Sequence, residues 1–337
     1  MTQLELLQRE FFNLSDIEKE VFLISITEQS SNLNEISKVK YDIGERRQKH
    51  CPYCQSQQIV ANGKNKGVQR FICNKCGKNF SENTGTSLAH LKKPHLWNTY
   101  LKHMFEGNSI AKCAALTGIS IQTSFDWRHK ILGSMQSLSP AGFSGISESD
   151  DIFFNYSEKG ARDIERAPRK RGNDGIKQGI SNDKVAVIVT CDRKQHKDLK
   201  VAKRGRLRKS DIQKVLSGKI DKNSVLCTDS HRSYTAFAKQ EGIKHEKLSA
   251  RKKQYVKDKI YHVQNVNQTA GSLKDWMRKF KGVATKYLQN YLSWYMVLEQ
   301  IKGKTHKIHE FAVAALVSTN AWFIFKSLAL NHMQFRT

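Results

Sequence analysis

The chain has 337 residues, of which 39% are hydrophobic, so it is long enough for two or three domains with buried cores. Its 57 lysines and arginines outnumber its 31 aspartates and glutamates, which gives a formal net charge of +26. Such an excess favours a polyanionic partner, and nucleic acid fits best. Solubility is the alternative explanation of the charge.

Targeting and membrane segments are not indicated by the sequence. The N-terminal stretch MTQLELLQREFF is acidic and amphipathic, unlike a signal peptide. The longest apolar run, 311–325, contains polar residues and is too short to cross a membrane, so we expect a core helix there. The seven cysteines indicate a reducing compartment and metal binding rather than disulfides. We therefore expect a cytoplasmic protein without a membrane partner.

Residues 1–45 predict one or two short helices. Ser15 and Glu18 form a capping-box pattern ahead of several apolar residues. The first forty residues hold seven acids and four bases, against the basic remainder. We expect a separate segment that does not touch the polyanion, with partner binding and dimer packing both open.

Residues 46–82 predict a zinc ribbon. Two CxxC pairs are separated by a strand, a glycine-rich turn and a second strand, and their cysteines are Cys51, Cys54, Cys73 and Cys76. Two such pairs turn four thiolates towards one point and make a closed tetrahedral Zn²⁺ site. Closed coordination indicates structural rather than catalytic zinc.

Residues 83–135 predict a helix-turn-helix. Asn108 or Ser109 caps one helix, Gly118 ends it and Ser120 caps the next. On the second helix Ile121 and Leu132 are expected on the packed face. Four residues are expected to point away and to meet base edges and phosphates in the major groove: Gln122, Thr123, Asp126 and Lys130. An ordinary three-helix bundle is the alternative.

Residues 142–302 predict an α/β domain. Strands are expected at 150–156, 184–192, about 197–202 and 224–229, followed or interrupted by helices at 209–216, 231–241 and 261–280. This order matches the ribonuclease-H-like fold. Between the first two strands lies a basic segment expected to run along DNA, with Arg166, Arg169, Lys170 and Arg171.

Two acids are placed for metal-dependent phosphodiester chemistry. Asp150 lies on the first strand of this domain and Asp229 ends the fourth. Two-metal cleavage needs oxygen ligands from separate elements that converge on one point. Asp151 competes with Asp150, because neighbouring residues on a strand point to opposite faces and only one can serve. Solvated or capping acids are the alternative reading.

The helix at 261–280 has two faces. Its apolar face contains Leu273 and Met277. Asn267 and Lys274 are seven residues apart and share a polar stripe, which Arg278 extends by one turn. We expect the domain to build its site against this stripe.

Five stretches carry a resemblance to a known family: CPYC…CNKC, SIAKCAALTGISIQTSFDWRHKIL, SESDDIFFNYSEKG, LCTDSHRSYTAFAKQEGIKHEKL and YHVQNVNQTAGSLKDWMRKFKGVATKYLQNYLSW. Over about residues 48–300 the chain resembles bacterial insertion-sequence transposases with an N-terminal zinc ribbon and an ISXO2-like transposase domain, the IS1595 family. The resemblance implies a multidomain α+β protein: zinc ribbon, helix-turn-helix and a ribonuclease-H-like catalytic domain. Residues 303–337 are expected to be a C-terminal helical segment.

The resemblance also implies a DDE-type catalytic set. Asp150 and Asp229 match its first two acids, and Asn267, followed by Lys274, stands at the position of the third. A catalytic Mg²⁺ (or Mn²⁺) would be held by Asp150, Asp229 and the Asn267 side-chain oxygen, with Lys274 at a phosphate.

The implied function is transposition at the bacterial nucleoid. The protein would bind the element's terminal inverted repeats in double-stranded DNA, cut there and join the ends to target DNA as a homo-oligomer. An inactive, transposase-derived DNA-binding regulator is the alternative, because Asn267 leaves the site one negative charge short. A structure-specific or RNA-directed nuclease is a third reading.

Overall fold

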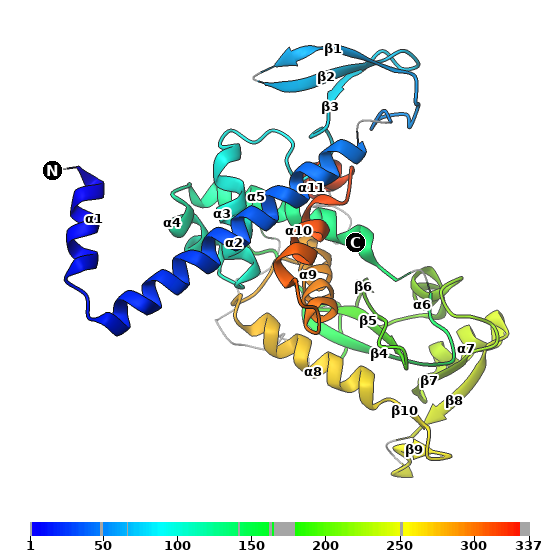
Figure 1. Cartoon of the computed structure of the whole chain (residues 1–337). Helices are drawn as coiled ribbons and strands as arrows, with labels where there is room; N and C mark the ends of the chain where they lie inside the picture. The colour runs from blue at the N-terminus through cyan, green and yellow to red at the C-terminus, as the bar shows by residue number, and fades with distance from the viewer. Residues whose placement is uncertain are drawn as a thin grey trace. The chain divides into compact units, whose positions relative to one another are not determined.

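The computed structural model describes residues 2–47, 50–65, 67–140, 142–161, 164, 179–249 and 252–330 (Figure 1). The chain forms two compact units, which we describe separately. Unit 1 comprises residues 1–128 and 303–319, and unit 2 comprises residues 129–302 and 320–337. The predicted basic residues Arg166, Arg169, Lys170 and Arg171 lie outside the described residues.

Unit 1 combines helices with a small sheet. Its elements are α1 (Gln3–Phe12), α2 (Asp16–Arg47), β1 (Ile59–Asn65), β2 (Val68–Cys73), β3 (Asn79–Ser81), η1 (Pro94–Leu96), α3 (Trp97–Phe105), α4 (Ile110–Thr117) and α10 (Lys307–Leu316). The three strands are antiparallel in the order β1-β2-β3. The predicted strand–turn–strand of the ribbon is therefore confirmed.

The N-terminal helices differ in length from the prediction. Helix α2 has 32 residues, so the expectation of short helices holds for α1 alone. The predicted capping box is confirmed, because the Ser15 N–H donates to Glu18 Oε2 (2.9 Å) and the Glu18 N–H donates to Ser15 Oγ (3.3 Å). The second half of α2 is packed, with Ile36 and Val39 buried.

Helix α4 is followed by Gly118 and then by α5 (Ile121–Met135), which runs from unit 1 into unit 2. Gly118 has φ +68°, a left-handed conformation that ends a helix readily only at glycine. Two predicted orientations on α5 are wrong. Ile121 is 64% exposed rather than packed, and Lys130 is 4% exposed, with its Nζ 4.7 Å from the centre of the Trp322 ring.

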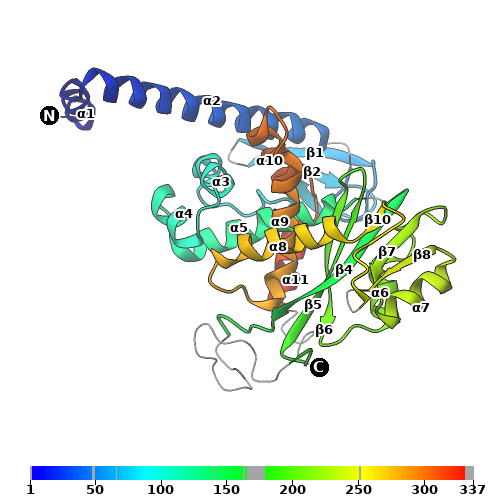
Figure 2. The ribbon, with the colours of Figure 1, turned by 90° about the horizontal axis from the view of Figure 1, so that it is seen from below.

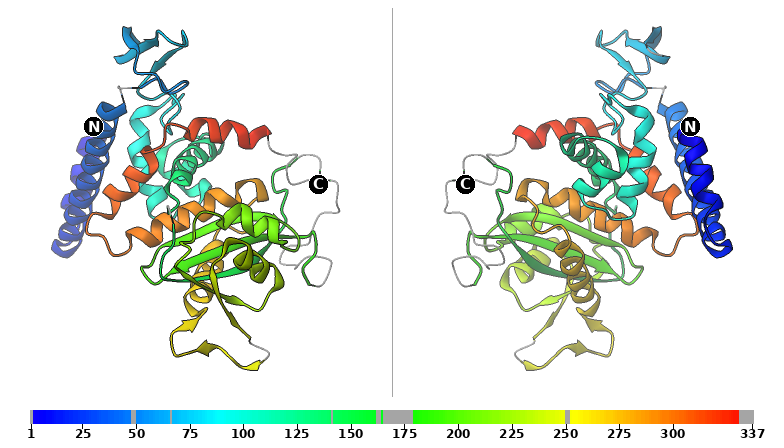
Figure 3. Two further views of the ribbon diagram at one scale, coloured as in Figure 1. Left: turned by 90° about the vertical axis from the view of Figure 1, so that its right-hand side faces the viewer. Right: turned by 90° about the vertical axis from the view of Figure 1, so that its left-hand side faces the viewer.

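Unit 2 is built on a five-stranded sheet in the order β6-β5-β4-β7-β8. Its strands are β4 (Ile146–Asn155), β5 (Lys184–Asp192), β6 (Lys197–Arg204), β7 (Val225–Asp229) and β8 (Lys244–Leu248). Strands β4, β5 and β6 are antiparallel neighbours, whereas β7 is parallel to both β4 and β8. Figure 3 shows these green strands from two opposite sides.

Helices cover both faces of this sheet. Helices α6 (Lys209–Leu216) and α7 (Arg232–Glu241) enclose a core with Ile188 and Leu226 of the sheet. Helices α8 (Gln264–Arg278) and α9 (Leu288–Ile301) lie against β4, β5 and β6 on the other face (Figure 2). Short elements complete the unit: η2 (Gln136–Leu138), the hairpin β9 (Val256–Lys257) with β10 (Tyr261–His262), η4 (Thr285–Tyr287) and α11 (Ala321–Leu330).

The expected order of strands and helices is found, with three local differences. Asp150 lies in the middle of β4 rather than at its start. Between the helices expected at 231–241 and 261–280 lies a further strand, β8, at the edge of the sheet. Tyr261 belongs to β10, so the helix begins at Gln264.

The apolar run 311–325 is not one helix. It is divided between α10 and α11, which are separated by residues 317–320. Within the described residues no single helix is long and apolar enough to cross a membrane, although α10 and the first part of α11 would pass that test together, by length and composition, as a bent pair.

Candidate active site and metal centre

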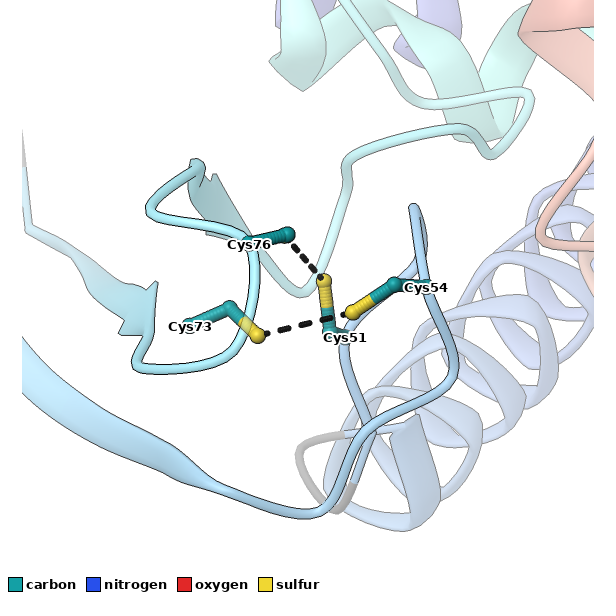
Figure 4. A group of neighbouring side chains, drawn as sticks. All are labelled: Cys51, Cys54, Cys73 and Cys76. Carbon is teal, nitrogen blue, oxygen red and sulfur yellow. Dashed lines mark hydrogen bonds between the residues drawn. The ribbon is translucent and has the colours of Figure 1, made fainter.

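The four ribbon cysteines come together in one cluster (Figure 4). Cys51 Sγ lies 3.7 Å from Cys76 Sγ, and Cys54 Sγ lies 3.6 Å from Cys73 Sγ. All four sulfur atoms lie within 4.8 Å of one another. Thiolates 2.3 Å from a tetrahedral zinc ion are about 3.8 Å apart, so the spacing fits Zn²⁺.

This cluster is closed on its apolar side. Cys51 and Cys73 are buried with Phe80, whose ring stacks on that of Phe71 at 5.6 Å. Four protein ligands leave no coordination position for a substrate. The ribbon therefore supports a structural zinc site, as the spacing of its cysteines predicted.

The two predicted catalytic acids lie on adjacent parallel strands. Strand β4 pairs with β7 in a register that sets Glu148 beside Cys227. The pairing ends at these residues. Two positions further along each strand, Asp150 and Asp229 are on the sheet face that Glu148 also occupies, because side chains alternate with a period of two. Asp151 points to the opposite face, where its neighbour Phe153 packs against the α6–α7 core.

The charges at this point of the sheet act on one another. Burial raises the pKa of the Asp150 carboxyl to about 7; the negative charges of Asp151 and Asp229 add to this, and Lys274 opposes it. Burial also raises the pKa of Asp151 to about 6, and Asp229 is the charge that adds to the effect. The charge of Asp151 therefore interacts with those of Asp150 and Asp229, although strand alternation turns its side chain to the other face.

Local hydrogen bonds fix both carboxylates. Asp150 Oδ1 accepts the Asp151 N–H at 2.8 Å, and Asp229 Oδ1 accepts the His231 N–H at 3.0 Å. The second bond turns the chain from β7 into α7, which begins at Arg232. Asp229 remains exposed at the strand end, so its carboxylate is accessible.

Helix α8 presents its polar stripe to solvent and its apolar face to the protein. Leu273 and Met277 are buried, as predicted, whereas Asn267 and Lys274 are exposed. Arg278 is also exposed, and its Nη1 lies 2.9 Å from Asp275 Oδ1. Lys274 is the residue of this stripe whose charge acts on Asp150.

Glu148 is a functional candidate that the sequence analysis missed. Its carboxylate is 1% exposed and accepts the N–H groups of Asn265 (2.9 Å) and Val266 (3.1 Å), together with the Asn265 side-chain amide (2.9 Å). Arg193 Nη1 lies 2.5 Å away, and His262 Nδ1 lies 3.4 Å away.

Glu148 therefore fastens the first turn of α8 to β4. A carboxylate at the first N–H groups of a helix also interacts favourably with the helix dipole. Since Glu148 and Asp150 share one face of one strand, this contact sets the position of the α8 stripe relative to Asp150. The acid two residues before Asp150 was the available sequence signal, but burial and partners on α8 and Arg193 are visible only in the fold.

The carboxylates do not form a compact cluster like that of the cysteines. Among the described histidines, cysteines, aspartates and glutamates, the four ribbon cysteines are the only group of three or more whose ligand atoms all lie within 4.8 Å of one another. Asn267 is not one of these four residue types. A set made of two carboxylates and the Asn267 amide therefore differs from such a cluster. The site at β4 and β7 is open, with oxygen donors on separate elements.

The predicted DNA-reading residues on α5 divide into two groups. Gln122 is exposed and its amide donates to Asp126 Oδ1 at 2.8 Å, while Thr123 and Asp126 are half-buried. Lys130, in contrast, is enclosed, so it does not fit a contact in a DNA groove.

These features define an α/β protein with an open pair of acids on adjacent strands and a separate four-cysteine ribbon. Residues 142–295 match the ISXO2-like transposase domain of the IS1595 type, and residues 48–77 match the InsA N-terminal domain, a zinc ribbon. The chain therefore carries an ISXO2-like transposase domain behind an InsA-type zinc ribbon, as its motifs indicated.

A curated relative supports this assignment. The chain is 24% identical over 264 residues to an uncharacterized protein in the transposable element ISH50 of Halobacterium salinarum. The aligned region covers 77% of this chain and 87% of the relative.

Two solved structures show weaker likeness. The first is a chain of the simian T-cell lymphotropic virus intasome in complex with the PP2A regulatory subunit B56 gamma, with 13% identity over 61% of this chain and 69% of that chain and a TM-score of 0.29. The second is a chain of a pre-cleavage Mos1 transpososome, with 10% identity over 65% of this chain and 78% of that chain and a TM-score of 0.19. At such TM-scores neither likeness defines the fold.

Proposed function

We propose that this chain is an insertion-sequence transposase that cuts and joins DNA. Its proposed catalytic acids are Asp150 and Asp229. The observation that carries the proposal is the parallel pairing of β4 with β7, which supports a common position for the two acids on the face covered by α8. The strand order β6-β5-β4-β7-β8, with its parallel half at β4, β7 and β8, supports a ribonuclease-H-like fold.

The donor set suits a hard divalent cation. Asp150 and Asp229 offer carboxylate oxygens, and Asn267 offers an amide oxygen, which are ligands that Mg²⁺ or Mn²⁺ accepts. Burial, together with the negative charges of Asp151 and Asp229, raises the pKa of Asp150, and a bound cation would favour its ionised form. When bound, such ions activate the attacking oxygen and stabilise the leaving oxygen of a phosphodiester. Strand alternation and the opposing effect of Lys274 favour Asp150 over Asp151 as the ligand.

The chain's other charged groups would bind and orient DNA. Lys274 is exposed beside Asp150 and is proposed to contact a phosphate at the scissile bond, with exposed Arg278 one turn further on. The helix pair α4–α5 and its tight turn at Gly118 support a helix-turn-helix that reads the terminal inverted repeats. Gln122, Thr123 and Asp126 are its proposed contacts, and Lys130 is left out because it is buried.

The proposed organisation follows the sequence. A helical segment (1–45), a zinc ribbon (46–82) and the helix-turn-helix (83–135) precede the catalytic domain (142–302) and a C-terminal helical segment (303–337). Bringing together two element ends and a target DNA requires more than one copy, so we propose a homo-oligomer acting at the nucleoid. The net charge of +26 supports double-stranded DNA as the partner.

The carboxylates are tested by cleavage of duplexes taken from both flanks of the reading frame, in Mg²⁺. We expect wild-type protein to nick them at defined positions and Asp150→Asn and Asp229→Asn to lose at least ~10³-fold in rate. Asp221→Asn, an exposed acid before β7, is the matched control and should cut normally. Equal cutting by wild type and both variants would overturn the catalytic assignment.

The third position is tested separately. Asn267→Asp should keep or increase metal-dependent cleavage if this side chain is a ligand, and Asn267→Ala should abolish it. Gln268→Ala, at the exposed neighbouring position, controls for changes on the helix surface. Normal cutting by Asn267→Ala would remove this residue from the ligand set while leaving the two acids in place.

A second candidate function is a DNA-binding regulator without activity. Asn267 favours it, because two carboxylates supply less negative charge than the three acids of a DDE set. Repeat binding by wild type without cleavage in either Mg²⁺ or Mn²⁺ would support this reading. Binding without preference for flanking over random duplex would favour a nuclease instead.

A further inference from the structure

The N-terminal arm, which we define as α1 and the first part of α2 (residues 2–26), carries an apolar surface that its own unit does not cover. Eight large apolar side chains of this arm are between 42% and 76% exposed: Leu6, Leu7, Phe12, Ile17, Val21, Phe22, Leu23 and Ile26. Together they present on the order of 800 Å² of apolar surface. Exposed large apolar side chains are normally scattered singly over a monomer, so this concentration within residues 6–26 indicates an interaction site.

The apolar residues surround the first part of α2. At about 100° per residue, Ile17 and Val21 lie on one side of the helix, and Phe22 and Ile26 lie on the opposite side. Apolar side chains exposed on opposite sides of one helix indicate that a partner covers more than one side. Helix α1 touches this segment where the Phe11 ring lies 5.6 Å from that of Phe22. The side with Ile17 and Val21 remains open, at 76% and 62% exposed.

The charge of the arm narrows the choice of partner. Residues 2–26 carry five acids and two bases, whereas the whole chain is strongly basic. Nucleic acid and anionic membranes attract basic surfaces, and membrane-surface helices are typically rich in lysine and arginine. The arm therefore fits a protein surface.

We propose that the arm pairs with the arm of a second copy of this chain. Two arms with apolar side chains on several sides can clasp each other into a helical bundle around a two-fold axis, the commonest symmetry of protein assemblies. The area agrees, because each partner of a standard-size interface contributes about 800 Å². Pairing through the arms leaves the basic remainder of both copies free for DNA. This inference gives a surface to the homo-oligomer of the proposed function.

Sedimentation of the full chain tests the proposal at micromolar concentration, without DNA. Wild type should sediment as a dimer, and Ile17→Glu/Val21→Glu should shift dissociation at least ~100-fold towards monomer, because two charges would be buried in the bundle. Both positions are exposed in the single chain, so helix content measured by circular dichroism should not change. Phe12→Glu, on α1, should weaken the dimer independently.

The matched control is Ser30→Glu/Ser31→Glu, which adds the same charge to exposed positions of α2 beyond the apolar segment. It should remain a dimer. A monomeric wild type, or a dimer that survives both Ile17→Glu/Val21→Glu and Phe12→Glu, would overturn the proposal, as would wild-type binding to vesicles of anionic lipid through the arm. Cleavage measured on a single repeat end separates this outcome from the catalytic assignment, since monomers that still nick DNA leave that assignment intact.

Discussion

The zinc ribbon and the proposed carboxylate site are arrangements of ligand residues built on different principles. The ribbon draws four ligands from residues 51–76, and its sulfur atoms already have the spacing of a tetrahedral site. The carboxylate site draws Asp150 from β4, Asp229 from β7 and Lys274 from α8, and its charges oppose one another. A closed local site stabilises a fold, whereas an open site made from distant elements keeps positions for water and substrate.

The largest expected effect is at the ribbon. Cys73→Ser should abolish zinc binding and unfold the ribbon, because structural zinc contributes on the order of 10 kcal/mol to such folds. Zinc content and the dispersion of ribbon amide resonances would measure this. Asp150→Asn should retain full zinc, and loss of zinc in both variants would contradict the separation of the two sites.

Glu148→Gln tests how the open site is held together. We expect about 3 kcal/mol lower stability, because Arg193 loses its buried counter-charge, and reduced cleavage through a displaced α8 stripe. Hydrogen exchange at the Asn265 and Val266 amides should accelerate, which a general loss of stability elsewhere would not single out.

The control for that variant is Glu246→Gln on β8. Glu246 Oε2 lies 2.5 Å from Lys257 Nζ. The substitution therefore also removes an ion pair, but it does not change a contact of α8. Equal effects of the two variants on cleavage and on the α8 amides would remove the positioning role of Glu148.

Burial of the Asp150 carboxyl near the negative charges of Asp151 and Asp229 should make the stability of the metal-free protein depend on pH. The folded pKa of about 7 lies above the ordinary value, so between about pH 4 and pH 7 the folded state holds a proton that the unfolded state has lost. Stability therefore falls as the pH rises through this range. In EDTA at pH 8, Asp150→Asn should be more stable than wild type, on the order of 2 kcal/mol, with no gain at pH 4. Thermal denaturation at both pH values measures this, and a gain of equal size at pH 4 would contradict it.

The smallest expected effect concerns the middle of α8. A Cβ at Gly271 would meet no atom within 4 Å, so Gly271→Ala should raise stability by about 1 kcal/mol through helix propensity and leave cleavage unchanged. Denaturant unfolding measures the gain. A large loss of activity would show that DNA approaches the helix closely at this point.

Much of the architecture follows from local sequence patterns. The apolar run of β5 is found at its predicted bounds, Lys184–Asp192, and α6 likewise at Lys209–Leu216. The CxxC pairs predicted the ribbon because all its ligands are close in sequence. Local patterns were weaker where the tertiary environment decides: β8 reads as a polar segment, KHEKL, and becomes a strand by pairing with β7.

By itself, the sequence determined the zinc ligands, the identity of Asp150 and Asp229 as candidates, and the two faces of α8. The tertiary structure decided which strands carry the acids side by side, because the β4–β7 register pairs residues almost eighty positions apart. It also decided that Lys130 is enclosed and that Glu148 holds α8. Periodicity gives the side of an element on which a residue lies, but burial and charge pairing depend on what packs there.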